Sequence, residues 1–121
     1  MKLRLKSNSI RIRLTKTEVS TLANTGYLEE KTPFINNTFI YSIQTIDSTE
    51  LSASLDSNKI TLFVPVDFIK EWPENDIVSL KGKMTVANDE ALYLLVEKDF
   101  VCLDETTEDQ SDNYTNPNSA C

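Results

Sequence analysis

Two sets of charged residues, near opposite ends of the 121-residue sequence, have the types and spacing to bind ions. The basic set is Lys2, Arg4, Lys6, Arg11 and Arg13. The acidic set is Asp104, Glu105, Glu108, Asp109 and Asp112. Clustered cations on one surface can bind the phosphates or carboxylates of a polyanion. Clustered carboxylates are hard oxygen ligands suited to Ca²⁺ or Mg²⁺.

The basic set is predicted to lie on one face of a β-hairpin. Charged and aliphatic residues alternate over residues 2–14, and Ser7-Asn8 suits a two-residue turn because Asn tolerates positive φ. This register places Arg4 opposite Arg11 and Lys2 opposite Arg13, so that all five cations share one face. The other face is aliphatic and consists of Leu3, Leu5, Ile10, Ile12 and Leu14.

The cationic face of this hairpin has two interpretations. It is either a solvated strand surface that protects a sheet edge from aggregation, or a site for an anion that relieves repulsion between the opposed cations. The formal net charge of −7 argues against nonspecific DNA binding. The hairpin also lacks the interleaved aromatic residues that form a platform for single-stranded nucleic acid.

The acidic set has three interpretations. The stretch DETTEDQSDNY could bind a metal ion through its five carboxylates, but it lacks the glycine and the final glutamate of an EF-hand loop. It could instead be a disordered acidic tail, because it has too few apolar residues to compensate for ordering. Finally, the tail could dock on the oppositely charged hairpin. We therefore divide the chain into a domain at 1–101 and an acidic tail at 102–121.

Several classes of enzyme are excluded by composition. The sequence has no histidine, which removes Ser-His and Cys-His dyads and imidazole metal ligands. Its two glycines, Gly26 and Gly82, are too far apart for a phosphate-binding loop. Cys102 and Cys121 lack a redox motif and are expected to be unlinked thiols. We expect no cofactor, and a binding protein is favoured over an enzyme.

The remaining pattern predicts an α+β fold built from a repeated unit. Thr15 and Glu18 fit a capping box at the start of a helix, and Gly26 fits its end. The Ser7-Asn8 turn recurs as Ser57-Asn58, with matching apolar positions on both sides. We therefore predict a duplicated β-β-α-β-β unit, residues 2–46 and 51–99, forming a mostly antiparallel curled sheet or a barrel with two short helices.

Two resemblances bear on the fold and the family. The stretch NKITLFVPVDFIKEWPENDIVSLKGK resembles the strand–helix–strand unit of swapped-hairpin and double-psi barrels, although Glu74-Asn75-Asp76 stands where those units have a glycine before the aspartate. The segments MKLRLKSNSIRIRLT, LYLLVEKDFVCL and DETTEDQSDNY together resemble an uncharacterised family of small acidic bacterial proteins, mainly from Bacteroidota. That family has no assigned activity, so the resemblance implies no catalytic or binding residue.

These observations lead to a hypothesis with two alternatives. We expect a non-enzymatic binding or interaction module whose basic face is covered by its own acidic tail. One alternative is an enzyme or sensor of a phosphorylated small molecule, and the other is an acidic protein that mimics DNA or binds a basic partner. The sequence does not identify the partner; we expect an anionic ligand or a protein and not a membrane. No apolar run has the length of a membrane span or a signal-peptide core, so a cytoplasmic location is expected.

Overall fold

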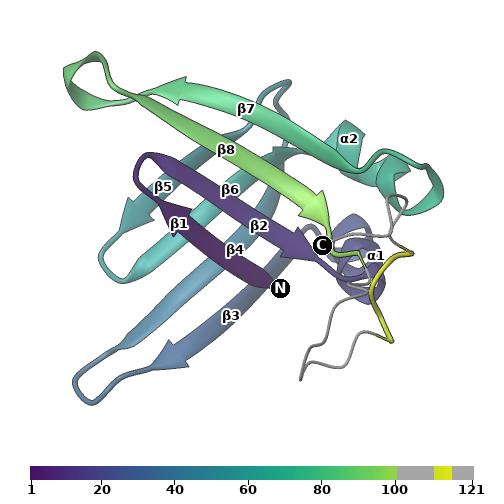
Figure 1. Ribbon diagram of the computed structural model, residues 1–121, viewed down its shortest axis with the longest axis horizontal. Coiled ribbons are helices and arrows are strands. Elements are labelled where there is room, and N and C mark those ends of the chain that lie inside the picture. The colour runs from purple at the N-terminus through teal and green to yellow at the C-terminus, as the bar shows by residue number, and fades with distance from the viewer. Residues whose placement is uncertain (101–110, 116–121) are drawn as a thin grey trace.

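The computed structural model describes residues 1–100 and 111–115, and it has the predicted α+β class (Figure 1). The first half comprises β1 (Lys2–Lys6), β2 (Ser9–Leu14), α1 (Lys16–Thr25), β3 (Tyr27–Pro33) and β4 (Thr38–Ile46). The second half comprises β5 (Ser52–Asp56), β6 (Lys59–Pro65), α2 (Val66–Glu71), β7 (Ser79–Thr85) and β8 (Ala91–Lys98). Short 3₁₀ turns lie at Trp72–Glu74 and Ala87–Asp89.

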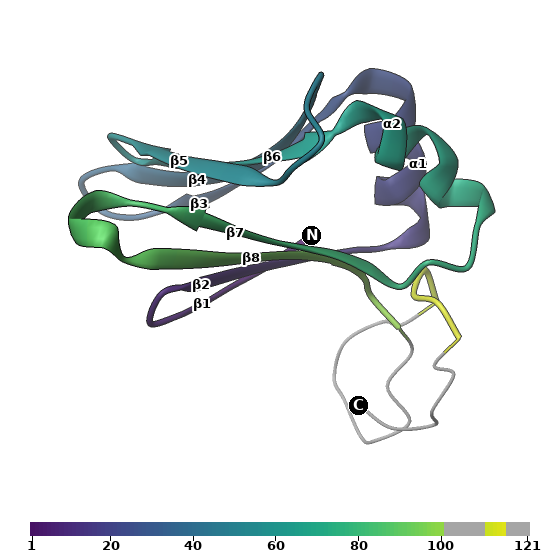
Figure 2. The same cartoon turned by 90° about the horizontal axis from the view of Figure 1, so that it is seen from above.

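The strands form two four-stranded mixed sheets that face each other. Sheet A has the order β1-β2-β8-β7, and sheet B has the order β3-β4-β6-β5. The central pairs, β2 with β8 and β4 with β6, are parallel, whereas the outer pairs are antiparallel. Figure 2 shows the helices at one end of the two layers and hairpin tips at the other.

The barrel that we considered for this chain is not formed. The two sheets do not close, because β6 and β7, which flank α2, belong to different sheets. The strand–helix–strand stretch that resembles a barrel unit therefore connects two layers here. The mostly antiparallel pairing is confirmed for four of the six strand pairs.

Both sheets follow one connection scheme. The counterparts in the two halves are β1 and β5, β2 and β6, β3 and β7, and β4 and β8. Exchanging each strand for its counterpart converts the order of sheet A, β1-β2-β8-β7, into β5-β6-β4-β3, which is the order of sheet B read from its other edge. The two Ser-Asn turns also match, because Ser7 and Ser57 have φ values of 48° and 53° and each turn joins strands in a two-residue loop. The internal duplication itself stays a prediction that superposition of 2–46 on 51–99 can test.

Local sequence signals account for α1. The hydroxyl of Thr15 accepts a hydrogen bond from the backbone N–H of Glu18, and the carboxylate of Glu18 accepts one from the backbone N–H of Thr15, which completes the predicted capping box. Gly26 adopts φ 81°, and its N–H donates to the carbonyl of Leu22. A residue with a Cβ would be strained in this left-handed conformation, so glycine suits the end of the helix.

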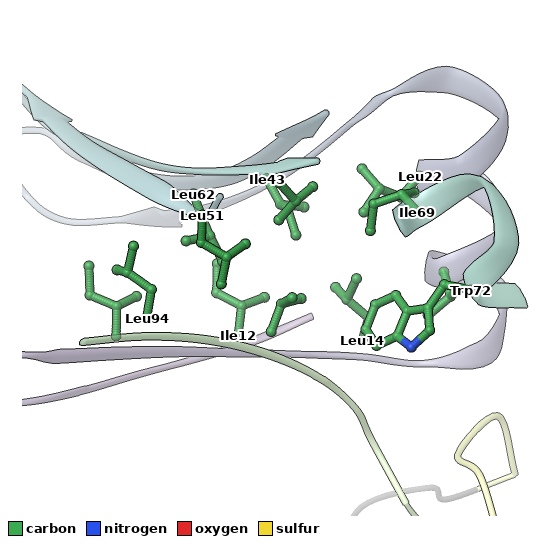
Figure 3. Close-up of a cluster of buried hydrophobic side chains, with 13 residues drawn as sticks. Ile12, Leu14, Leu22, Ile43, Leu51, Leu62, Ile69, Trp72 and Leu94 are labelled. Carbon is green, nitrogen blue, oxygen red and sulfur yellow. The ribbon is translucent and has the colours of Figure 1, made fainter. Parts of the chain in front are cut away.

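The core lies between the inward faces of the sheets and continues under the helices (Figure 3). Inward residues alternate with outward residues along β2, where Ile10, Ile12 and Leu14 are buried. At the helix end, Trp72 is fully buried and its indole N–H donates to the carbonyl of Ile77. At the opposite end Leu5 is 54% exposed, because the hairpin tip extends beyond the packed core.

Candidate anion-binding face

The outward face of sheet A carries most of the positive charge of the chain. The strand register arranges it in three rows across β1, β2, β8 and β7. The first row is Lys6, Ser9, Tyr93 and Lys83; the second is Arg4, Arg11, Leu95 and Lys81; the third is Lys2, Arg13, Glu97 and Ser79. We call these twelve positions the basic face. It holds seven of the 12 lysines and arginines in the sequence and a single acid.

The hairpin register within this face is as predicted. Lys2 pairs with Arg13, and Arg4 pairs with Arg11. Residues directly opposite each other in an antiparallel pair project from the same side of the sheet, so the five cations of β1 and β2 share the basic face. Ile10 and Ile12 point to the other side and are buried.

Two further cations of the basic face, Lys81 and Lys83, were missed by the sequence reasoning. They lie on β7, at the opposite edge of the sheet, in register with Leu95 and Tyr93 of β8. The alternation of charged and small or apolar residues in SLKGKMT was a usable signal for their shared face. Their position beside the hairpin was not predictable locally, because it depends on β8 pairing in parallel with β2.

Part of the positive charge is neutralised within the sheet. Glu97 accepts a hydrogen bond from Nε of Arg13 at 2.6 Å, and its same oxygen lies 3.5 Å from Nε of Arg11. Nζ of Lys2 lies 3.0 Å from the buried carboxylate of Asp99. Glu97 thus offsets part of the repulsion among the hairpin cations through Arg11 and Arg13, and the third row is the least available to an external anion.

The first and second rows hold four cations with no ion pair to another described residue: Arg4, Lys6, Lys81 and Lys83. All four are exposed. Two belong to β1 and two to β7, and three strand spacings of about 4.8 Å separate these edges by roughly 14 Å. Between them lies a shallow depression of about 210 Å³, with Arg11, Lys81, Tyr93 and Leu95 in its lining. The arrangement therefore offers a central strip, partly apolar, with two of these four cations along each side.

The acidic set falls mostly outside the described residues. Asp104, Glu105, Glu108 and Asp109 lie there, as do Cys102 and Cys121, so their predicted roles stay predictions. Asp112 is described, and it lies at the N-terminus of α1. It accepts a hydrogen bond from the hydroxyl of Thr17 at 3.0 Å, and its carbonyl accepts one from the N–H of Lys16.

The pKa of Asp112 is lower than usual, chiefly because the Thr15 hydroxyl donates to its carboxylate and also because Thr17 does so. Beside it, the N–H of Tyr114 donates to the carbonyl of Asp99 at 2.8 Å. The segment 111–115 is thus fastened to the start of α1 and to the end of β8, as the yellow ribbon in Figures 1 and 2 shows. Asp112 itself makes these contacts with α1 and not with the hairpin cations.

Other kinds of site find little support in the part of the chain that the structure describes. Over residues 1–100 and 111–115, no group of three or more potential ligands is arranged to hold a metal ion. Within the same ranges, neither α-helix is long and apolar enough to cross a membrane.

The fold and the face define an α+β protein with two interleaved four-stranded sheets and a cationic outer surface. The chain belongs to a family of unknown function (DUF7009), which it matches over residues 1–118. No curated protein and no solved structure matches it.

Proposed function

We propose that this protein is a non-enzymatic interaction module that binds an acidic polypeptide segment on its basic face. The observation that carries the proposal is the register of sheet A, which places Arg4 and Lys6 on one edge and Lys81 and Lys83 on the other. Carboxylates of an extended segment lying along the central strip would reach cations on both sides. Tyr93, which is 48% exposed, and Leu95 would contact its apolar side chains.

An acidic polypeptide fits this face better than a nucleic acid does. The net charge of −7 repels a distant nucleic acid, whereas a short acidic segment requires only a local patch of opposite charge. Tyr93 is the one aromatic residue among the twelve positions of the face, which is too few for a run of stacked bases.

The tail of the protein is part of this proposal. It supplies an acidic segment in the same molecule, and we propose that it competes with an external partner for the basic face. Two contacts support this proposal. Segment 111–115 docks on α1, and Phe100 pairs with Tyr114 just beyond the end of β8. The acidic stretch therefore begins and ends near sheet A. We also propose, independently of this binding function, a cytoplasmic location, unlinked cysteines and an internal duplication of the β-β-α-β-β unit.

Binding of a labelled peptide with the sequence LDETTEDQSD, residues 103–112, tests this function. The Lys81→Gln/Lys83→Gln variant should weaken its binding about threefold to tenfold, since each exposed ion pair contributes roughly 0.2–1 kcal/mol. Lys31→Gln/Lys70→Gln is the matched control, because it removes the same charge from exposed positions outside the basic face. Equal weakening by both variants would show that only net charge matters. Tighter binding of a single-stranded oligonucleotide of equal charge would favour nucleic acid as the partner.

A further inference from the structure

The second concentration of functional groups surrounds Lys98, at the helix end of the molecule. Inward positions of β8 are occupied by Leu92, Leu94 and Val96, and the same alternation places Lys98 inward. Its neighbour in register on β2 is the fully buried Leu14. Lys98 is only 4% exposed, which is exceptional for a lysine.

The ammonium group of Lys98 is incompletely satisfied. Within the described residues it donates one hydrogen bond, to the carbonyl of Asn75 at 2.7 Å, although an ammonium has three N–H donors. No carboxylate of the described residues lies within ion-pair distance of it. Burial lowers the pKa of Lys98, and the charge of Asp76 opposes this effect from a distance.

Aromatic rings compensate for part of the lost hydration. Nζ of Lys98 lies 5.6 Å from the ring centre of Trp72 and 5.0 Å from that of Tyr114. Such contacts stabilise a cation without using its N–H donors. The topologically equivalent position of β4 is Thr45, which is in register with Val64, and its short hydroxyl reaches the carbonyl of Gly26. A small residue can therefore fill this place in the fold, and the lysine exceeds what packing requires.

Lys98 opens into a pocket of about 550 Å³, a size typical of small-molecule sites. Its apolar walls include Pro73, Val78, Phe100 and Tyr114. Lys16 contributes a second cation to the lining, and its Nζ lies 5.8 Å from the ring centre of Tyr114. Glu74 and Asp76 also line the pocket, so a ligand with several negative charges would be repelled.

We propose that this pocket binds a small organic monocarboxylate with a flat apolar body, whose carboxylate accepts hydrogen bonds from Lys98. The carboxylate would use the two donors that Asn75 leaves free. The apolar body would lie against Phe100 and Tyr114, whose ring centres are 5.7 Å apart. The pocket lies at the helix end of the molecule and none of its lining residues belongs to the basic face, so this site is separate from the basic face and does not depend on it.

Trp72 provides a direct assay, because it is the only tryptophan in the sequence and lies beside Lys98. Benzoate, acetate and inorganic phosphate are titrated into the full chain, while the fluorescence of Trp72 is recorded. We expect a saturable change with benzoate, at least tenfold weaker binding of acetate, and no response to phosphate. Lys98→Met keeps the length of the side chain and should weaken benzoate binding at least tenfold. Lys81→Met, on the basic face, is the control and should bind benzoate as the original chain does.

If Lys98→Met does not fold, a measurement on the original chain can still test the proposal. In the original chain, nuclear Overhauser contacts between benzoate protons and the ring protons of Phe100 or Tyr114 should appear. The proposal is overturned if benzoate gives no saturable signal, if phosphate binds as well as benzoate, or if folded Lys98→Met retains full affinity. Failure of peptide binding to the basic face would leave this result unaffected.

Discussion

The α-amino group of Met1 lies 2.5 Å from Oε2 of Glu18, the residue whose other oxygen completes the capping box of α1. One carboxylate thus joins the start of the chain, the start of the first helix and the loop between β2 and α1. The amine also lies 3.9 Å from the carboxylate of Glu30 on β3, which brings it close to both sheets.

This relationship predicts that Glu18→Gln lowers stability by more than the loss of an exposed charge does. The amide still has an oxygen for the N–H of Thr15, but the amine of Met1 loses its closest charged partner. We expect a reduction of about 1–3 kcal/mol in the free energy of unfolding, measured by urea denaturation. The control Glu71→Gln alters an exposed glutamate of α2 and should change stability by less than about 0.5 kcal/mol. Equal effects would contradict a structural role for the Met1–Glu18 contact.

Lys98 gives a prediction about alkaline pH. Because its pKa is lower in the folded protein than its ordinary value of 10.5, the unfolded chain binds this proton more tightly. The destabilisation that it causes is fully present below the folded-state pKa and is relieved as pH rises toward 10.5. The stability of Lys98→Met relative to the original chain should therefore decrease over that window.

Urea denaturation of both chains between neutral pH and pH 10.5 measures this effect. Asp76, Lys16 and Tyr114 lie around Lys98 and are present in both chains. Lys70→Met, which removes an exposed lysine of α2, corrects for the loss of one charge. A difference that is constant with pH would contradict the burial of a charged Lys98.

Asp112 should hold the segment 111–115 on α1. Its pKa is lowered by hydrogen bonds from Thr15 and Thr17, so its contribution is present above its ordinary pKa and is lost as pH falls through its folded-state pKa. In Asp112→Asn, the amide of Lys16, which donates to the carbonyl of residue 112, should exchange about threefold to tenfold faster. Hydrogen exchange by NMR measures this change. The difference should vanish at acid pH, and Asp67→Asn in the first turn of α2 should leave the amide of Lys16 unaffected.

Neutralising the remaining tail acids should strengthen peptide binding to the basic face. Converting Asp104, Glu105, Glu108 and Asp109 to amides removes four negative charges and changes the formal net charge from −7 to −3, while Asp112 keeps its contacts with α1. We expect at least about threefold tighter binding of the labelled acidic peptide. The control converts four exposed acids elsewhere to amides and reaches the same net charge: Asp47, Glu50, Asp67 and Glu71. If the control binds equally tightly, the tail does not compete for the face.

Gly82 permits the close approach of the two sheets. A Cβ added there would lie 2.8 Å from Cβ of Leu51, an atom that cannot swing aside because it is attached to the backbone. Gly82→Ala should therefore lower the free energy of unfolding by about 1–3 kcal/mol. Leu80→Met, a substitution of similar volume on the inward side of the same strand, should cost less. A Gly82→Ala variant as stable as the original chain would show that the sheets can separate at no cost.

The features predicted correctly from the sequence depend on neighbours in the chain. The hairpin register, the positions of the Ser-Asn turns and the capping box each require only a few consecutive residues, and all three are confirmed. The reason given for the turns was wrong, because Ser7 and Ser57 adopt positive φ and the asparagines do not. The two parallel pairs, β2 with β8 and β4 with β6, connect distant segments, and no local pattern specifies them. For this reason the chain was expected to form one curled sheet or a barrel.

The same distinction applies to the candidate sites. The five hairpin cations were found because their alternation is local, whereas Lys81 and Lys83 joined them only through β8. Lys98 had a local signal that was overlooked, since it continues the inward series of Leu92, Leu94 and Val96. A charged residue at an inward position of an apolar strand is a sign of a special environment.

The interleaved strand order has a consequence for synthesis of the protein. Each sheet takes one hairpin from each half of the chain, so neither half can complete a sheet by itself. Arg13 and Glu97, which meet across the parallel pair of sheet A, are 84 residues apart. On the ribosome, the hairpins β1-β2 and β3-β4 therefore emerge first. Their neighbouring strands, β8 and β6, have not yet been translated at that point. Sheet A cannot be completed before β8 is made, so folding of this chain is a late and concerted event dominated by distant contacts.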